Sequence, residues 1–151
     1  FLPVFFDAIS EWSKKKLAWV NYIVKGTHPY TEHFGIFRAN VPNSDPTTQI
    51  NQGVFNALNT FDDIYVAGEA RSHCTANSVR QILQIAPNLA PKMVILEDCM
   101  SDVPGGPGGP GTTPTFGELA QPIYDDAKAK GVKFVKSTNV VGFKQPAAAS
   151  V

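Results

Sequence analysis

The sequence predicts an α/β protein in which a mostly parallel sheet lies between layers of helices. Helical and strand patterns alternate strictly along the 151 residues, starting with a helix and ending with a strand. The run at 92–98 is continuously apolar, as is typical of strands in parallel sheets. The run at 64–67 is also short and apolar, and it stops at a glycine. Strands that alternate with helices are joined by right-handed crossovers, and ligands bind at the carboxyl ends of such strands.

The first half of the chain is expected to contain a helix, a strand, a long loop and a second helix. Residues 3–16 predict a helix with one buried stripe, because apolar side chains recur at three- and four-residue spacing. These side chains are Val4, Phe5, Ala8, Ile9 and Trp12. The β-rich run 18–24 predicts a strand, and residues 26–46 an irregular loop. Thr47 or Thr48 is expected to cap the next helix. Its inward side chains are Ile50, Val54, Phe55 and Leu58.

The second half is expected to contain three strands and two helices. The elements in order are a strand at 64–67, a helix at 74–86, a strand at 92–98, a Pro/Gly loop at 104–114, a helix at 116–130 and a strand at 132–141. Pro87 and Gly131 end the two helices, and Pro122 makes the second one irregular. The side chains expected to face inward are Val79, Ile82, Leu83, Ala86, Leu119, Ile123 and Ala127.

Composition predicts one domain, over residues 1–144, followed by a loose tail at 145–151. Lysine and arginine total 13, as do aspartate and glutamate, so the formal charge is zero. Without a basic stripe, neither nucleic acid nor an anionic membrane is an expected partner. Two cysteines make no disulfide framework, and no apolar run approaches the roughly 18 residues of a membrane helix. A reducing, cytoplasmic location is therefore expected. Because the chain opens on Phe1 within an amphipathic pattern, it is expected to be N-terminally incomplete.

Cys74 stands where a strand pattern gives way to a helical one. A thiol at a helix N-terminus lies near unpaired backbone N–H groups and the positive end of the helix dipole, which favour the thiolate. Lys25 would add a cation if its strand lies beside the strand at 64–67. The same N–H groups could stabilise an oxyanion on a substrate carbonyl. The stretch therefore predicts a nucleophilic cysteine.

Each of these residues also has an ordinary structural interpretation. A lone cysteine is most often a small buried hydrophobic residue, and Lys25 alone would be a solvated lysine. Cys99 is expected to be structural, and Asp98 either a catalytic acid or, more commonly, a loop cap. The three histidines, His28, His33 and His73, match no strong zinc spacing.

Three stretches, in order along the chain, resemble one family. In IYVAGEARSHCTANSVRQIL, a strand is followed by the pattern Gly-x-Ala-x-x-x-Cys and a helix. YIVKGTHPYTEHFGIF resembles a strand ending in Lys-Gly, followed by an acidic residue and an aromatic turn, and VILEDCMSDV is similar to the strand that comes next. Together they resemble the isochorismatase-like cysteine hydrolases, which include nicotinamidases. The matching residues are Lys25, Gly26, Glu32, Phe34, Gly68, Ala70 and Cys74.

The resemblance implies a three-layer α/β/α, Rossmann-like fold whose first strands are missing from this chain, and an Asp, Lys, Cys triad. Cys74 would attack the carbonyl carbon of a small-molecule amide and form a thioester, while Lys25 would support the thiolate. The backbone N–H groups of Ala70 and Cys74 would form the oxyanion hole, with a cis peptide bond between Glu69 and Ala70. The residues expected near the substrate are Tyr30, His33, Phe34, Glu69 and His73.

The chain departs from the family in one respect. The family's catalytic aspartate block and the Asp-x-His metal ligands of nicotinamidases are both absent. Asp7 lies in a helical pattern, too close to the lysine block to replace that aspartate. No metal ligand or other cofactor site is predicted in this chain, and a divalent metal is expected only if upstream residues carry its ligands.

Three functions are therefore in competition. The first is a cysteine hydrolase acting on a C–N amide bond. The second is a catalytically inactive binding or assembly module that keeps the fold, as the absent aspartate suggests. The third is a redox-sensing thiol, which the lack of a neighbouring resolving cysteine disfavours. An exposed aromatic start of the first helix would favour its burial against the missing N-terminal part or against a partner, such as a second copy in a homo-oligomer.

Overall fold

The computed structural model describes residues 3–140, so the tail predicted at 145–151 lies outside the described residues. Three parallel strands form one sheet in the order β1 (Ile64–Val66), β2 (Met93–Leu96), β3 (Lys133–Val135). Ile64 lies opposite Met93, and Val94 opposite Lys133. The carboxyl ends of the three strands therefore share one edge of the sheet, as the alternating pattern predicts.

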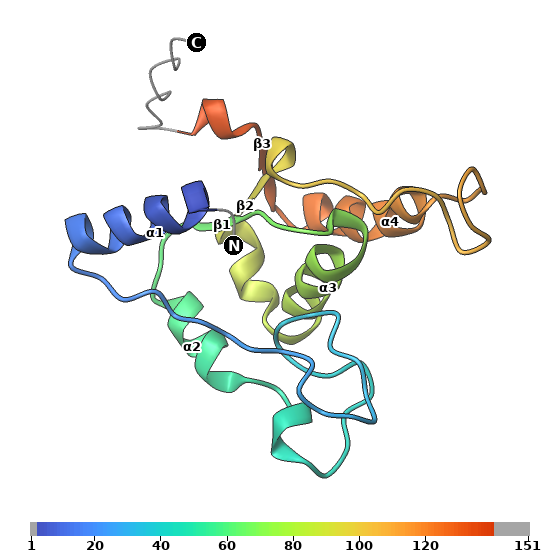
Figure 1. The fold of residues 1–151 in the computed structure, drawn as a ribbon, viewed down its shortest axis with the longest axis horizontal. Coiled ribbons are helices and arrows are strands. Elements are labelled where there is room, and N and C mark those ends of the chain that lie inside the picture. Colours follow the sequence, from blue (N-terminus) through green and yellow to red (C-terminus); the bar gives the residue numbers. More distant parts are fainter. Residues whose placement is uncertain (1–2, 141–151) are drawn as a thin grey trace.

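Two helices cover one face of this sheet. β1 is followed by a π-helical turn at Arg71–Thr75 and by α3 (Ala76–Ile85), and β2 is followed by α4 (Phe116–Ala129). Both crossovers step across the sheet in the same direction, so right-handed connections bring both helices to the same face. There α3 and α4 contact each other, and α4 also contacts the π-helical turn (Figure 1).

The remaining elements lie before β1, between the main ones or after β3. They are α1 (Pro3–Lys16), α2 (Gln52–Asn59) and the 3-10 turns Pro46–Thr48, Pro87–Lys92, Glu97–Cys99 and Ser137–Asn139. Within residues 3–140, no helix is both long and apolar enough to cross a membrane.

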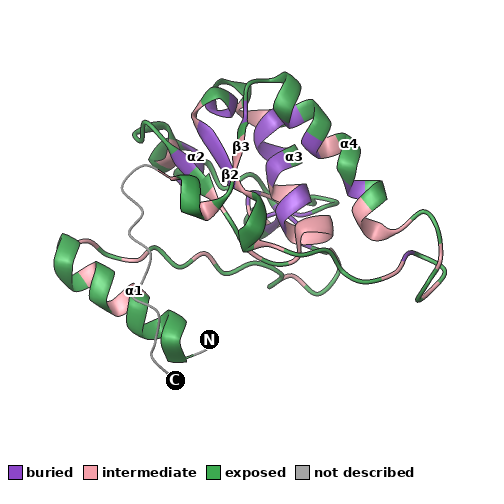
Figure 2. Cartoon of the chain, turned by 90° about the horizontal axis from the view of Figure 1, so that it is seen from above, coloured by how far each residue is buried: buried purple, intermediate pink, exposed green. Residues whose placement is uncertain are grey.

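The core lies between the sheet and α3, with contributions from α2 and α4. On α3, the prediction that Val79, Ile82 and Leu83 face inward is confirmed, because all three are buried. Phe37 and Phe55 stack at 4.3 Å and join the loop before α2 to this core. Figure 2 shows the buried residues gathered on the sheet and α3, while α1 is mostly exposed.

The strand predicted at 18–24 does not form. These residues are irregular, and Trp19 and Val24 are 96% and 80% exposed. A strand requires a neighbouring backbone for its hydrogen bonds, and β1 pairs only with β2 among the described residues. Ile23 alone of this run packs partly against the core. High β-propensity was therefore insufficient to form a strand, because these residues have no neighbouring strand to pair with in the described part of the chain.

The buried stripe predicted on α1 is also wrong, although the helix has the predicted bounds. No residue of α1 is buried, and Val4, Phe5 and Trp12 are 81%, 53% and 47% exposed. Helical periodicity shows that one face is apolar, but burial needs a surface to cover it. Figure 2 shows α1 lying apart from the sheet.

Two further predictions about helix faces are wrong. Asn51, rather than Thr47 or Thr48, caps α2, because Thr48 belongs to a preceding 3-10 turn and Ile50 stays outside the helix. On α4, Leu119 is 49% exposed, because the buried positions, Ala120, Tyr124 and Ala127, follow a neighbouring stripe of that helix.

Candidate active site

The turn that carries Cys74 is fixed by backbone hydrogen bonds to the segment after β2. Gly68, at φ +130°, donates its N–H to the Cys99 carbonyl at 3.2 Å, and Arg71 donates its N–H to the Ser101 carbonyl at 2.8 Å. A φ in this range favours glycine. The peptide bond between Glu69 and Ala70 is cis, as the family resemblance implies. The cysteine thus lies in the π-helical turn at the entrance to α3, as the sequence predicts.

Lys25 and Cys74 meet although the strand expected to carry the lysine is absent. The Lys25 ammonium donates a hydrogen bond to the Cys74 sulfur at 3.4 Å and another to the His33 carbonyl at 2.8 Å. Cys74 is a free thiol of intermediate exposure, so the pair is reachable from solvent. The structure therefore brings the two predicted catalytic side chains together, through a loop rather than through adjacent strands.

A serine that the sequence reasoning missed links this loop to the cysteine helix. The Ser78 hydroxyl donates to the Cys74 carbonyl at 2.8 Å and accepts from the Ile36 N–H at 3.2 Å. Ser78 lies four residues after Cys74, so it shares that helix face. The spacing could have indicated the contact with Cys74, but the contact with Ile36 spans 42 residues and depends on the tertiary fold.

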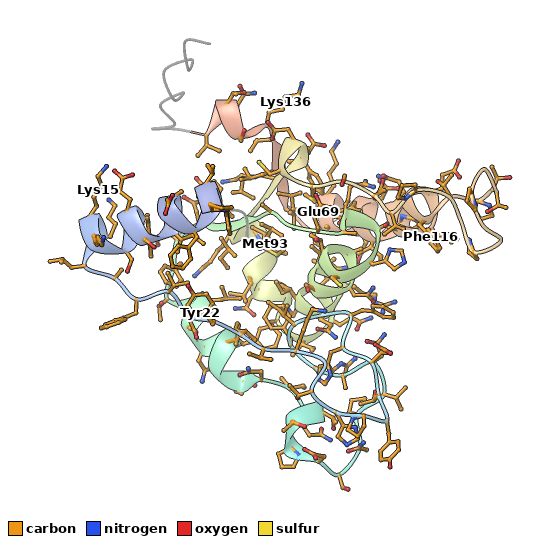
Figure 3. The ribbon with its side chains drawn as sticks, viewed as in Figure 1. Lys15, Tyr22, Glu69, Met93, Phe116 and Lys136 are labelled. Atoms are coloured by element: carbon orange, nitrogen blue, oxygen red, sulfur yellow. The ribbon has the colours of Figure 1, made fainter. Side chains whose placement is uncertain are left out.

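An aromatic cluster lies beside the cysteine turn. The His73 ring makes edge contacts with Phe34, at 6.2 Å between centroids, and with Phe116, at 4.8 Å. The Ser72 hydroxyl lies 2.9 Å from His73 Nδ1. Phe116, which the sequence reasoning missed, is the first residue of α4 (Figure 3). Phe34 and His73, two of the residues expected near the substrate, are thus in contact.

The other three predicted pocket residues are placed elsewhere or already have structural partners. Glu69 accepts a hydrogen bond from the Ser101 hydroxyl at 2.9 Å, which ties the turn to the segment after β2. His33 is only 7% exposed, and its Nδ1 is buried without a partner. Tyr30 is 90% exposed. The five candidates therefore do not form one cluster.

A surface pocket of about 630 Å³ lies within the loop that follows Lys25. Its walls include Tyr30 and Phe34 together with His28, Glu32 and Asn40. Cys74 is not among its lining residues. The pocket adjoins the candidate site through Phe34 but does not contain the thiol.

Arg71 anchors the cysteine turn to α4. Its guanidinium pairs with Asp102 at 3.0 Å, donates to the Gln121 amide oxygen at 2.7 Å and lies 4.4 Å from the centre of the Tyr124 ring. Tyr124 in turn donates its hydroxyl to the Arg71 carbonyl at 2.7 Å. Burial raises the pKa of Tyr124 to about 12, against the opposing effect of the Arg71 charge. Both the backbone and the side chain of Arg71 therefore bind the cysteine turn to α4 and Asp102.

The remaining acidic and thiol candidates have structural roles or none. Asp98 accepts hydrogen bonds from the Ser137 N–H and hydroxyl, which hold its pKa below the ordinary value and make it a loop cap. Cys99, expected to be structural, is exposed. In the described part of the chain, no cluster of His, Cys, Asp or Glu could hold a metal ion. The residues present therefore do not fit the metal centre of the nicotinamidase pattern.

The chain thus combines a parallel α/β sheet with a lysine–cysteine pair at the carboxyl end of its first strand. By sequence, the chain matches no protein-family model and no curated protein. By structure, it is similar to a nicotinamidase and pyrazinamidase from Acinetobacter baumanii, with a TM-score of 0.51 and 20% identity over 79% of this chain. The yeast nicotinamidase bound to the inhibitor nicotinaldehyde gives a TM-score of 0.53 and 16% identity over 86% of this chain. A second structure of the yeast enzyme gives 0.53 and 17% over 85%.

These similarities confirm the predicted fold. The chain spans 48%, 51% and 50% of the three neighbours, or about half of each. Identities of 16% to 20% support the fold and not the chemistry. The function is therefore argued from the site itself.

Proposed function

We propose that this chain carries the nucleophile of a cysteine hydrolase that cleaves the C–N bond of a small-molecule amide. The observation that carries the proposal is the 3.4 Å contact between the Lys25 ammonium and the Cys74 sulfur. A cation at this distance attracts the thiolate, which is the nucleophilic form of cysteine. The pair lies at the carboxyl end of β1, where ligands bind in sheets of this kind.

The reaction requires two steps at Cys74. In the first, the thiolate attacks the amide carbonyl carbon, a C–S bond forms, and the C–N bond breaks as the leaving nitrogen takes a proton from solvent water and departs as an amine or ammonia. In the second, water attacks the thioester, the C–S bond breaks, a carboxylate and the thiolate are released, and the two protons of the water pass to solvent. Lys25 stabilises the thiolate before attack and after release.

The negative oxygen formed in each step needs hydrogen-bond donors. The N–H groups of Ala70 and Cys74 belong to the turn in which the nucleophile lies, and we assign the oxyanion to them. None of the hydrogen bonds within residues 3–140 is donated by the Ala70 N–H, so this group is available to a ligand. Removing one such donor typically costs about a hundred- to a thousandfold in rate.

The substrate class follows from the surroundings of the thiol and from the structural neighbours. Phe34, His73 and Phe116 present aromatic surfaces beside the turn, which suit a flat, uncharged ring. The neighbours are nicotinamidases, so nicotinamide is the first probe. A homo-oligomer and a cytoplasmic location remain predictions.

The test is release of ammonia from nicotinamide and a panel of small primary amides. We expect hydrolysis by the wild-type protein to be lost in Cys74→Ala and kept in Cys99→Ala, which removes the exposed thiol. Hydrolysis that survives in Cys74→Ala would contradict the proposal. Mass spectrometry of the protein with a slow substrate should show the acyl group on Cys74.

A second candidate is a binding or assembly module without catalysis. The observation that favours it is the set of Lys25 contacts: its ammonium contacts a carbonyl and a sulfur, and no carboxylate of residues 3–140 hydrogen-bonds to Lys25 or Cys74. The family resemblance assigns proton transfer to an aspartate. Saturable amide binding with no ammonia release, by a protein whose full sequence has no such aspartate, would support this candidate over the enzyme.

A further inference from the structure

Gln81 is a buried polar side chain that holds the loop between Lys25 and α2. It is 6% exposed, accepts a hydrogen bond from the Phe37 N–H at 3.0 Å and donates one to the Arg38 carbonyl at 2.9 Å. Both partners are backbone groups, so the amide fixes the path of the chain there. Gly35 lies so close that a Cβ on it would overlap the Gln81 amide. The loop is therefore fitted to this side chain.

The same face of one helix carries the thiol and holds this loop. Cys74, Ser78 and Gln81 follow one another at spacings of four and three residues, which places them along one face. Ser78 joins the Cys74 carbonyl to the Ile36 N–H. Residues 36–38 are thus bound to the helix by three hydrogen bonds from two side chains.

The held loop in turn locates the ammonium of Lys25. The loop includes His33, two residues before Gly35, and the His33 carbonyl accepts the 2.8 Å hydrogen bond from Lys25. The second hydrogen bond of that ammonium goes to Cys74. A closed ring of contacts therefore runs from Cys74 along α3 to Gln81, through the loop to His33 and Lys25, and back to the sulfur.

We propose that Gln81 is a positioning residue that sets the Lys25 ammonium beside the Cys74 sulfur. The side chain is far along the helix from the thiol and acts through the loop. The inference deepens the proposed function and rests on it for its catalytic meaning. Its test reads the charge beside the sulfur and does not require amide hydrolysis.

The test compares two alkylating reagents on the same thiol. Iodoacetate is an anion and iodoacetamide is neutral, and both react with the thiolate, so the ratio of their rates reports the positive charge near the sulfur. The experiment uses the full chain with Cys99→Ala, so that Cys74 alone reacts. The variant is Gln81→Met, which keeps the volume but loses both hydrogen bonds. The matched control is Gln84→Met, at an exposed position of the same helix.

We expect the rate ratio to fall about fivefold in Lys25→Met, the factor for one unit charge at about 4 Å in water. Gln81→Met should approach this value, and Gln84→Met should keep the wild-type ratio. In the double variant Lys25→Met and Gln81→Met, the ratio should equal that of Lys25→Met alone, because both changes remove the same effect.

Two results would overturn the proposal. One is a folded Gln81→Met protein with the wild-type ratio, and the other is a double variant in which the two effects multiply. Circular dichroism and thermal melting establish folding. If Gln81→Met does not fold, Gln81→Ala, whose shorter side chain leaves room for water at the two loop groups, is measured under the same criteria. Absence of amide hydrolysis with the expected ratios would remove the proposed function and leave the positioning role intact.

Discussion

Tyr124 and Arg71 are bound to each other twice. The tyrosine hydroxyl donates to the Arg71 carbonyl at 2.7 Å, and the guanidinium of the same arginine lies 4.4 Å from the centre of the tyrosine ring. Tyr124 is 2% exposed on α4, whereas Arg71 begins the π-helical turn that carries Cys74. One side chain of α4 therefore fixes both the backbone and the side chain of the residue that opens the cysteine turn.

Replacing Tyr124 by phenylalanine should lower the free energy of unfolding by about 1 kcal/mol at pH 7, because a buried hydrogen bond is lost. The pKa of Tyr124 is raised from 10.0 to about 12, mainly by burial. A raised pKa contributes stability below the ordinary value, and this is lost as pH rises through about 12. The wild type should therefore lose its greater stability relative to Tyr124→Phe as pH rises from 10.0 to about 12.

Urea unfolding as a function of pH measures this loss of stability. Tyr65→Phe, at a half-exposed position, is the control, and parallel curves for wild type and Tyr124→Phe would contradict the prediction.

Alkylation should distinguish the two thiols. Iodoacetamide is expected to modify Cys74 faster than Cys99 at neutral pH, although Cys99 is the more exposed, because within residues 3–140 an ammonium lies 3.4 Å from the Cys74 sulfur and none hydrogen-bonds to Cys99. Lys25→Met should slow the Cys74 reaction about fivefold. Lys136→Met, the same change at another exposed lysine, should leave it unchanged. Peptide mapping by mass spectrometry gives both rates, and equal rates at the two thiols would argue against an activated cysteine.

Two glycine substitutions should have opposite effects on stability. In Gly35→Ala, the new Cβ would overlap the buried Gln81 amide and push it from its two hydrogen bonds, at a cost of about 1–3 kcal/mol. In Gly53→Ala, the nearest atom lies 3.5 Å away, and replacing a helical glycine should stabilise the protein by about 0.5–1 kcal/mol. Urea denaturation of both variants tests the pair. An unchanged free energy of unfolding in Gly35→Ala would show that the added Cβ does not displace the Gln81 amide.

The start of α4 depends on a capping box. Thr115 accepts from the Glu118 N–H, and Glu118 accepts from the Thr115 N–H. Thr115→Ala is expected to lower the free energy of unfolding by about 1 kcal/mol, the usual cost of losing an N-cap side chain. Glu118→Gln keeps the reciprocal hydrogen bonds and should cost much less. Chemical denaturation compares the two, and similar losses would mean that the charge of Glu118 matters more than the cap.

Local patterns determined most of the fold in this sequence. The strands at β1 and β2, the helices α3 and α4 and their ends were predicted because apolar periodicity, Pro87 and Gly131 act within a few residues of the chain. The position of Cys74 in the turn that enters α3 followed from the same signals. These features depend on sterics and backbone hydrogen bonding between residues that are close together in the chain, so they can be predicted from the sequence alone.

Features that need a distant partner were decided by the tertiary structure. Residues 18–24 have strand propensity but no neighbouring strand among the described residues, and no side chain of the apolar stripe of α1 is buried. Local patterns give no sign of the role of Gln81, because its two hydrogen-bond partners are backbone groups more than 40 residues away. Phe116 likewise reaches His73 only through the packing of α4 on the cysteine turn.

The sequence by itself determined that a thiol stands at the entrance to a helix after a parallel strand, and that Lys25 was its candidate partner. The tertiary structure decided how that partner arrives. Lys25 reaches Cys74 from a loop fixed to α3 by Ser78 and Gln81, with no strand beneath it. The physical reason is that periodicity encodes which face of an element is apolar. The contacts that set a charge beside a sulfur are single hydrogen bonds between segments far apart in the chain.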